Sequence, residues 1–325
     1  MRIFVTGGAG YIGSVMTDVL VDGGHDVTVF DNLSRGYRDA ISPRARFVEG
    51  DLADTPHVLK TLKESGVEAV IHLAGDAIVS ESMAHPARYY RNNLIAGLSL
   101  LEAMRGAGVK PIVFSSTCAV YGVPERIPLD EGMATCPISP YGESKLAFER
   151  ALDWFRLAHG FKVVALRYFN AAGAGPRSGE RHDPETHLIP IVLDAAAGAN
   201  RPVTIFGADY PTRDGTCVRD YIHVLDLADA HLLAIDFLRR SAPRMEIYNL
   251  GCGGDGHTIR EVISCVEKVT GKRIATADGP RRPGDPPVLV ASSDKVRREL
   301  GWKPSRESLN VIIESAWNYK TGIRD

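Results

Sequence analysis

The sequence predicts an α/β protein built on a doubly wound parallel sheet. Over the first half of the chain, short apolar runs rich in β-branched residues alternate with amphipathic stretches, which is the pattern of strands joined by crossover helices. The first run, 2–6, leads directly into a glycine-rich turn and a helical stretch. With 325 residues, 44% of them apolar, the chain can form one large domain or two smaller domains that share a site.

The composition argues against several kinds of partner. The 38 Lys and Arg residues balance 40 Asp and Glu residues without a block of like charge, which argues against nucleic acid or an anionic membrane. No apolar run approaches the roughly 20 residues of a membrane span. The five cysteines form no CxxC pair, so we expect neither a disulfide framework nor a metal site. The chain opens directly on a strand, without a cleavable leader, and the expected location is cytoplasmic.

The first glycine turn, TGGAGYIGS, has the context of a dinucleotide site. Gly7, Gly10 and Gly13 lie between a strand and a helix predicted over 14–22. Glycines let the backbone approach a pyrophosphate, and the start of a helix supplies N–H groups to it. The spacing alone also fits a tight structural turn, so the next unit of the chain carries much of the argument.

The second predicted strand ends in an acidic residue, at the position where the adenosine ribose of a dinucleotide is expected. The second strand, 27–30, is followed by Asp31, 18 residues past Gly13. A carboxylate there accepts hydrogen bonds from ribose hydroxyls and repels a 2′-phosphate, so NAD is favoured over NADP. A third strand, predicted over 47–52, includes Asp51, which could contact the adenine amino group or could simply stabilise a turn.

The segment SPYGESK is where we expect the chemistry. Ser139 is typical of a helix cap, and a helix is predicted from Pro140 to His159. Tyr141 and Lys145 are four residues apart and share one face of it. An ammonium near a phenol favours phenolate, so the tyrosine could exchange a hydroxyl proton near neutral pH. On spacing alone the pattern is common, and an ordinary surface helix with a plain Tyr and Lys is the favoured interpretation.

The remaining elements complete the sheet and then change in character. Further strands are predicted over 68–75, 112–114 and 162–168, and a long helix over 85–106. After residue 173 a Gly- and Pro-rich stretch over 175–184 is typical of a boundary or a mobile loop. Beyond it we predict helices over 188–198, 224–240, 258–270, 293–300 and 309–319 and strands over 203–206 and 247–250.

Several of these stretches resemble one protein family. TGGAGYIGS, SPYGESK, LRYFNAAGA and the long block from Ile205 to His231 resemble the extended short-chain dehydrogenase/reductase family, and within it the UDP-hexose 4-epimerases. The resemblance implies a Rossmann domain over 1–172, joined by a returning segment near 216–242, and a smaller C-terminal α/β substrate domain over 173–325. It also implies a homodimer formed through the helices near 85–106 and 141–159.

The resemblance implies a reaction and residues that carry it. UDP-glucose and UDP-galactose would interconvert at C4 through a transient 4-keto sugar, with tightly bound NAD. Tyr141 would take the proton of the 4-hydroxyl, Lys145 would hold the nicotinamide ribose, and Thr117 would hydrogen-bond the 4-oxygen and relay the proton. The implied cofactor-binding residues are Gly7, Gly10, Tyr11, Ile12, Gly13, Asp31, Asn32, Asp51, Leu52, Leu73, Ala74, Gly75, Asn92, Ser115, Tyr141, Lys145 and Tyr168. The implied substrate-binding residues are Thr117, Tyr141, Phe169, Asn170, His187, Leu188, Thr204, Phe206, Arg219, Tyr221, Arg282, Asp285 and Leu289.

Three positions depart from the pattern of many family members. Ala77 stands where a lysine often contacts the cofactor pyrophosphate, so NAD retention is expected to be weaker. His187 replaces an asparagine beside the substrate diphosphate and can still donate a hydrogen bond. Leu289 falls at the position that limits the space beside the sugar 2-substituent, and its size is intermediate.

Three alternative functions are compared with epimerisation of UDP-glucose. A 4-epimerase of UDP-N-acetylglucosamine or UDP-glucuronate would use the same chemistry on another sugar. A nucleotide-sugar dehydratase needs an acid pair beside Thr117, but Cys118 and Ala119 follow it here. A non-enzymatic NAD-binding protein would not need the tyrosine and lysine that this chain retains.

Overall fold

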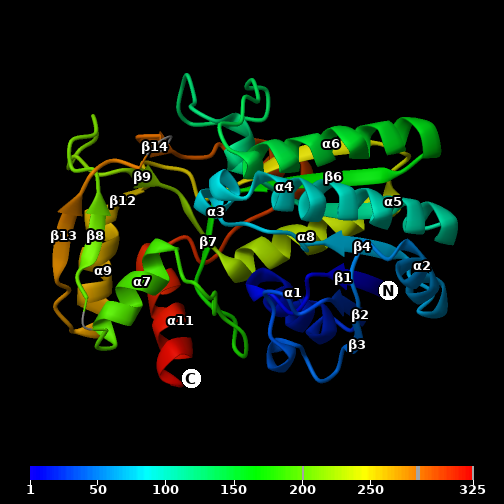
Figure 1. Cartoon of the computed structure of the whole chain (residues 1–325), viewed down its shortest axis with the longest axis horizontal. Helices are drawn as coiled ribbons and strands as arrows, with labels where there is room; N and C mark the ends of the chain where they lie inside the picture. Colours follow the sequence, from blue (N-terminus) through cyan, green and yellow to red (C-terminus); the bar gives the residue numbers. More distant parts are fainter. Residues whose placement is uncertain (200, 283–285, 324–325) are drawn as a thin grey trace.

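Seven parallel strands form the central sheet of the protein (Figure 1). The computed structural model describes residues 1–199, 201–282 and 286–323. In spatial order the strands are β11 (Met245–Leu250), β6 (Lys162–Tyr168), β5 (Pro111–Thr117), β4 (Ala69–His72), β1 (Arg2–Thr6), β2 (Asp26–Asp31) and β3 (Arg46–Glu49). Strand β1 lies in the middle of the sheet. Strands β2 and β3 are added on one side of it, and β4 and the later strands on the other. The carboxyl ends of β1 and β4 therefore flank the crevice in which such folds bind ligands.

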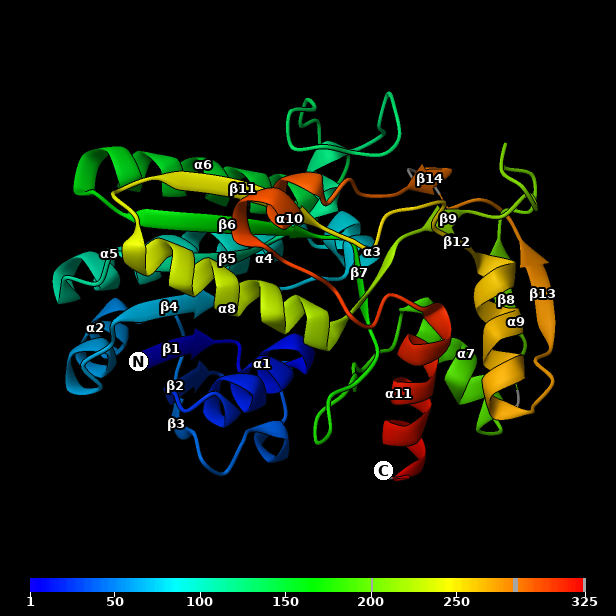
Figure 2. The same cartoon turned by 180° about the vertical axis from the view of Figure 1, so that it is seen from behind.

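Helices cover both faces of this sheet, as the doubly wound class requires. One face carries α1 (Tyr11–Asp22), α8 (Val224–Arg240) and α10 (Asp294–Leu300), whose apolar side chains join one core with the strands. The other face carries α2 (Thr55–Glu64), α5 (Ala96–Ala107) and α6 (Pro140–His159), which close the second core. Figure 2 shows α8 crossing the first face beside α1 and α10. The predicted fold class is confirmed.

The long helix predicted over 85–106 is interrupted. It consists of α4 (Pro86–Tyr89), a π-helical turn η2 (Tyr90–Ile95) and α5, and it follows the short helix α3 (Val79–Ala84). The π-turn carries Asn93, which accepts from the Asp76 amide at 2.8 Å and donates to the Ser144 hydroxyl at 3.1 Å. The widened turn therefore ties this helix to the loop after β4 and to α6.

A smaller α/β unit lies beyond the carboxyl ends of the strands. Helices α7 (Leu188–Ala196), α9 (Ile259–Thr270) and α11 (Leu309–Thr321) share a core with β8 (Val203–Phe206), which pairs in parallel with β13 (Thr276–Gly279). Short pairings join the two units: β7 (Asn170–Ala172) with β10 (Tyr221–His223), and β9 (Val218–Arg219) with β12 (His257–Thr258) and β14 (Val288–Leu289). Short 3₁₀ turns occupy η1 (Arg38–Ala40) and η3 (Cys118–Tyr121). Over the described residues no helix combines the length and apolar character that crossing a membrane needs.

One ion pair is fully enclosed in the core beneath the cavity. Arg167, near the end of β6, donates to both carboxylate oxygens of Glu149 on α6, at 3.0 and 2.6 Å, and both side chains are at most 4% exposed. The Ser116 hydroxyl donates to the same carboxylate at 2.5 Å. The pair therefore fixes α6 against the ends of β5 and β6.

Acid is expected to destabilise the fold through three buried histidines. His72, His223 and His231 are at most 1% exposed, and burial lowers their pKa values to about 3, 4 and 4. Their unfolded pKa is about 6.5, so their stabilisation is present above pH 6.5 and is lost as pH falls toward 4, because the unfolded chain binds the extra protons. Burial raises the pKa of Asp220 to about 6, so between about pH 6 and 4 the folded chain binds a proton there that the unfolded chain does not. This offsets the effect of one of the three histidines.

These four groups predict a loss of about 3 kcal/mol of unfolding free energy per pH unit in that range. Urea unfolding at pH 7, 6 and 5 measures it. In the control variant His223→Asn the amide can still cap α8, as the ring nitrogen now does for Leu225 N, and the slope should fall by about 1.4 kcal/mol per pH unit. A free energy of unfolding that stays flat from pH 7 to 5 would contradict the prediction.

Candidate active site

A cavity of about 1320 Å³ opens where the carboxyl ends of the sheet strands face the smaller unit. A site for one drug-sized ligand has roughly 300–1,000 Å³, so this cavity has room for a dinucleotide together with a second ligand. Every residue that the sequence analysis placed in the cofactor-binding or substrate-binding set, and that the structure describes, lines it. Asp285 is the exception, because it lies outside the described residues.

The glycine turn forms a tight cradle at one end of the cavity. Gly7 has a φ of +72°, and a Cβ there would lie 2.6 Å from the Ala74 nitrogen. A Cβ on Gly13 would lie 2.1 Å from the Gly7 oxygen. Helix α1 starts after Gly10, and along this described segment no side chain caps it. The N–H groups of the first turn therefore face the cavity, as an anion site requires.

The acids at the ends of β2 and β3 lie beside this cradle. Asp31 accepts from the backbone of Ala9 at 3.0 Å and of Leu33 at 2.8 Å, and burial raises the pKa of its carboxyl. Asp51 accepts from the Asn32 amide at 2.9 Å. These bonds hold both carboxylates in place at the cavity wall and leave them lone pairs for hydroxyl donors. The residues present fit an adenosine dinucleotide with an unphosphorylated ribose, so they fit NAD.

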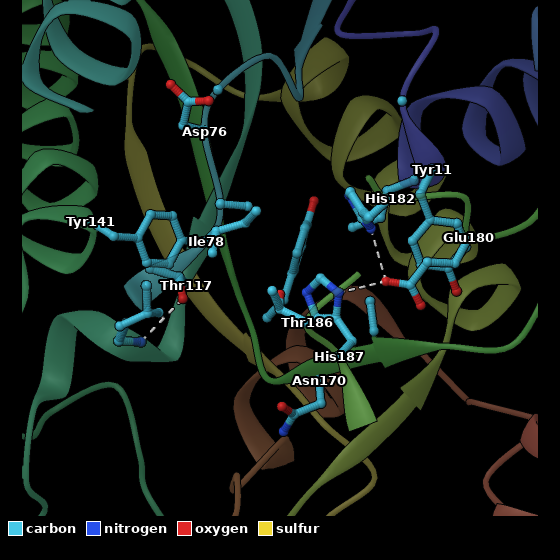
Figure 3. Close-up of a pocket in the computed structure, with 18 of the residues that line it drawn as sticks. Tyr11, Asp76, Ile78, Thr117, Tyr141, Asn170, Glu180, His182, Thr186 and His187 are labelled. Atoms are coloured by element: carbon cyan, nitrogen blue, oxygen red, sulfur yellow. Dashed lines mark hydrogen bonds and ion pairs between the residues drawn. The ribbon is translucent and has the colours of Figure 1, made fainter. Parts of the chain in front are cut away.

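Tyr141, Thr117 and Lys145 meet deeper in the cavity. Ser139 caps α6 by accepting from the Gly142 amide, as predicted, which sets Tyr141 in the first turn. Figure 3 shows the Tyr141 ring and Thr117 together on one wall. Lys145 is 5% exposed, and its ammonium donates to the Ser115 carbonyl at 2.9 Å and lies 5.0 Å from the centre of the Phe114 ring. A proton donor, a relay hydroxyl and a cation therefore border one space.

Two arginines border the opposite end, in the smaller unit. Arg219 donates to the carbonyls of Val218 and Pro286, both at 2.9 Å. Arg282 lies over the Phe206 ring, 4.1 Å from its centre. Asn170, between the two ends, donates to the Asp220 carbonyl at 2.8 Å. The cavity thus runs from an anion cradle to a cationic end, with Tyr141 between them.

Tyr168 and His231 support the wall behind Lys145. The Tyr168 hydroxyl hydrogen-bonds Nε2 of His231, whose Nδ1 pairs with the Leu227 carbonyl at 2.8 Å. Nδ1 must donate to the carbonyl, so Nε2 accepts, and the imidazole is neutral. Helix α8 is thereby connected through Tyr168 to the cavity.

The sequence model of the NAD dependent epimerase/dehydratase family matches residues 3–251 of the chain. The chain belongs to this family. The "UDP-glucose 4-epimerase" of Lacticaseibacillus casei is 48% identical over 321 residues, covering 98% of this chain and 96% of that protein. The UDP-glucose 4-epimerase from Brucella ovis in complex with NAD superposes with a TM-score of 0.94 at 45% identity, covering 97% of each chain. The enzyme from Bifidobacterium longum in complex with NAD+ and UDP gives 0.93 at 38% identity, covering 99% of this chain and 98% of that chain.

One electrostatic expectation for Tyr141 is wrong. The sequence predicted that Lys145 would bring the Tyr141 phenol close to ionisation near neutral pH. Burial instead raises the pKa of Tyr141 to about 12, although a hydrogen bond with Thr117 acts to lower it. Burial also lowers the pKa of Lys145 to about 8, against the opposite effect of Asp76 and Glu149. The desolvation of both groups, and the engagement of the ammonium by Ser115, outweigh their proximity along the helix.

The loop where the family often has a lysine is organised by ion pairs. Ala77 lines the cavity, and its neighbour Asp76 pairs with Arg88 at 2.7 Å and accepts from the Asn92 amide at 2.7 Å. Arg35 also lines the cavity and pairs with Glu81 at 2.6 Å. The buried Asp76 carboxylate is therefore neutralised by the protein, and Arg35 is a cation near the cradle that the sequence analysis did not single out.

The sequence analysis also missed one whole segment of the wall. Glu180, His182, Glu185 and Thr186 line the cavity, although residues 175–184 were interpreted as a boundary or mobile loop. The segment is held at its start, where the Tyr11 hydroxyl donates to the Gly173 carbonyl at 2.6 Å. The alternation of glutamate and histidine over 180–187 was the available signal. Composition rich in Gly and Pro concealed it.

Proposed function

We propose that this protein interconverts UDP-glucose and UDP-galactose by inverting C4. The observation that carries the proposal is that Tyr141, Thr117 and Lys145 border a single cavity that has a dinucleotide cradle at one end and Arg219 and Arg282 at the other. The three relatives described above are each named UDP-glucose 4-epimerase, which favours a UDP-hexose as the molecule at the cationic end. Arginines suit a diphosphate because their planar fork can bind two oxygens at once.

The chain's own residues would move the proton of the 4-hydroxyl. When bound, NAD supplies the hydride acceptor and a positively charged ring. Tyr141 then ionises more readily, since a nearby positive charge favours phenolate, and Thr117 passes the 4-hydroxyl proton to it. The C4 hydrogen would leave as hydride, and a 4-keto sugar would remain. The ketone would turn to present its other face and regain the hydride there, and Tyr141 would return the proton through Thr117, so that C4 is inverted.

Other residues would orient the reactants. Lys145 would bind the ribose hydroxyls next to the nicotinamide, while Gly10 and the first turn of α1 would hold the pyrophosphate. His187 presents its Nδ1 to Glu180 at 2.8 Å, so only its other ring nitrogen is available to a ligand. Leu289 packs against the apolar cluster that contains Phe169 and lines the cavity, where its side chain would limit the room beside the sugar 2-substituent.

Product analysis tests this assignment. The protein is incubated separately with UDP-glucose, UDP-N-acetylglucosamine and UDP-glucuronate, each with and without added NAD, and the nucleotide sugars are separated. We expect UDP-galactose from UDP-glucose, and a rate that rises with added NAD because Ala77 supplies no cation. A product from UDP-N-acetylglucosamine or UDP-glucuronate, with none from UDP-glucose, would refute the choice of sugar.

We also propose the division into a Rossmann domain over 1–172 and a substrate domain over 173–325, with the segment near 216–242 returning to the first. Strand β11 pairs with β6 as part of the same sheet and helix α10 packs on that sheet, so we add these two later segments to the first domain. The proposed location is the cytoplasm, which the family resemblance favours.

A homodimer is proposed through α5 and α6, which pack together on one face of the sheet. Large apolar side chains are exposed there: Trp154 is 70% exposed, Leu157 58% and Ile95 55%. Such a patch is typical of a protein interface. Light scattering should give twice the chain mass for the parent and the single chain mass for Leu157→Glu. A parent of single mass would refute the proposal.

A further inference from the structure

Four metal-ligating side chains gather on the cavity wall away from Tyr141. Glu180, His182, Glu185 and His187 each offer one donor atom, and these atoms all lie within 4.8 Å of one another. Figure 3 shows Glu180, His182 and His187 facing one another across the cavity from Tyr141 and Thr117. The proposed epimerisation uses His187 only as a donor to substrate and assigns no role to the other three.

The donor atoms are close to the spacing that a cation needs. Nδ1 of His187 lies 2.8 Å from Glu180 Oε1 and 2.9 Å from Glu185 Oε1, and Nδ1 of His182 lies 3.0 Å from Glu180 Oε1. In a tetrahedral zinc site with bonds of about 2.0–2.2 Å, neighbouring ligands are about 3.4 Å apart. The observed separations, from 2.8 to 4.8 Å, bracket that value, so side-chain adjustments of under about 1.5 Å would complete the site.

Neighbouring groups orient these side chains toward the cavity. Between Glu180 and His182, Arg181 points away, with its guanidinium 4.1 Å from the Tyr37 ring centre and 3.1 Å from an Asp39 oxygen. Glu180 and His182 are thereby turned toward the cavity. The amides of Thr186 and His187 donate to Glu185 Oε1 at 2.7 and 2.8 Å, which fixes that carboxylate. A site whose ligands are already oriented loses less freedom on binding.

The charges of the cluster favour a cation. The Glu180 and Glu185 side chains are only 9% and 13% exposed, and both approach the same imidazole. The two carboxylates are partnered by the rings of His182 and His187. A dication bound among the four side chains would satisfy both carboxylates at once. Two imidazoles and two carboxylates suit zinc and similar first-row ions, and suit magnesium or calcium less, because those prefer oxygen ligands alone.

We propose that Glu180, His182, Glu185 and His187 bind one divalent first-row transition ion, for which Zn²⁺ is a suitable occupant. The ion would cross-link residues 180–187, directly before α7, and thereby hold this wall of the cavity. It would not contact the reacting hydroxyl, since Tyr141 and Thr117 lie on the other wall. The site contains no cysteine, which is why cysteine spacing gave no sign of it.

Metal binding by the intact protein tests the proposal without any sugar substrate. Tag-free protein is treated with a chelator, exchanged into metal-free buffer, and titrated with Zn²⁺ and with Co²⁺. We expect one Zn²⁺ retained per chain by elemental analysis, an intense visible spectrum of four-coordinate Co²⁺, and a Zn²⁺-dependent rise of Tm. His182→Gln and Glu180→Gln should each weaken binding by at least roughly 10-fold, the loss typical of a damaged metal site.

The exposed His159, at the far end of α6, provides the matched control, and His159→Gln should bind as the parent does. Circular dichroism and metal-free Tm establish that each variant is folded. If His182→Gln does not fold, Glu180→Gln alone decides the ligand assignment. The proposal is overturned if the parent retains no zinc, or if the folded ligand variants bind it as tightly as His159→Gln does.

Discussion

Replacing Tyr141 with phenylalanine is expected to lower kcat by roughly 10²- to 10⁴-fold, the range typical of a lost general acid–base group. The ring remains packed edge-on against Tyr89, with centroids 6.3 Å apart, so the wall of the cavity keeps its shape. Only the hydroxyl that exchanges the 4-hydroxyl proton is removed. Steady-state kinetics of UDP-galactose formation, together with the NAD content of the variant, measure the effect.

Tyr248→Phe is the matched control, because it also removes one phenolic hydroxyl. That ring is buried in β11, and its hydroxyl donates to Glu299 at 3.1 Å, outside the cavity lining. Its kcat should stay within about twofold of the parent. A Tyr141→Phe variant that binds NAD and turns over like the parent would refute the proposed proton transfer.

Arg167→Met is expected to cost about 3 to 5 kcal/mol of unfolding free energy, the usual penalty for stranding one partner of a buried ion pair. The Glu149 carboxylate would keep its hydrogen bond from Ser116 but lose the cation that compensates its charge. Methionine fills much of the same volume, so the effect comes from charge more than from a void. Urea unfolding measures it.

The exposed pair of Arg105 and Glu102 on α5 is the control, with an N–O distance of 2.7 Å and side chains 49% and 45% exposed. Arg105→Met should cost less than about 1 kcal/mol, because solvent screens exposed charges. The double variant Arg167→Met, Glu149→Leu should recover most of the loss. Equal losses for Arg167→Met and Arg105→Met would mean that burial of the pair is not what stabilises α6 against the sheet.

Much of the fold follows from local patterns in the chain. The β-branched runs and the glycine turn predicted the strands and helices of the first half, and Ser139 predicted the start of α6, because apolar runs and cap signals act over a few residues. The family and its NAD-dependent chemistry are likewise confirmed by the matches to known proteins. The roles of individual side chains, including Tyr141, Lys145 and Thr117, stay predictions.

The features that escaped prediction depend on contacts between distant residues. The π-turn over 90–95 carries Asn93, which bonds the loop at Asp76, 17 residues away along the chain. The Tyr141 pKa depends on how deeply the folded cavity encloses the phenol, and helix spacing carries no information about that. The segment over 180–187 has loop composition, and its place in the cavity wall depends on how the folded chain packs.

The central claim is that a hydride leaves C4 of a UDP-hexose and returns to the same carbon within one active site. NMR of the products formed from UDP-glucose in D₂O, with NAD present, tests it most directly. UDP-galactose should accumulate to equilibrium with ordinary hydrogen retained at C4. Deuterium at C4, accumulation of a 4-keto-6-deoxy sugar, or unchanged UDP-glucose would contradict the account.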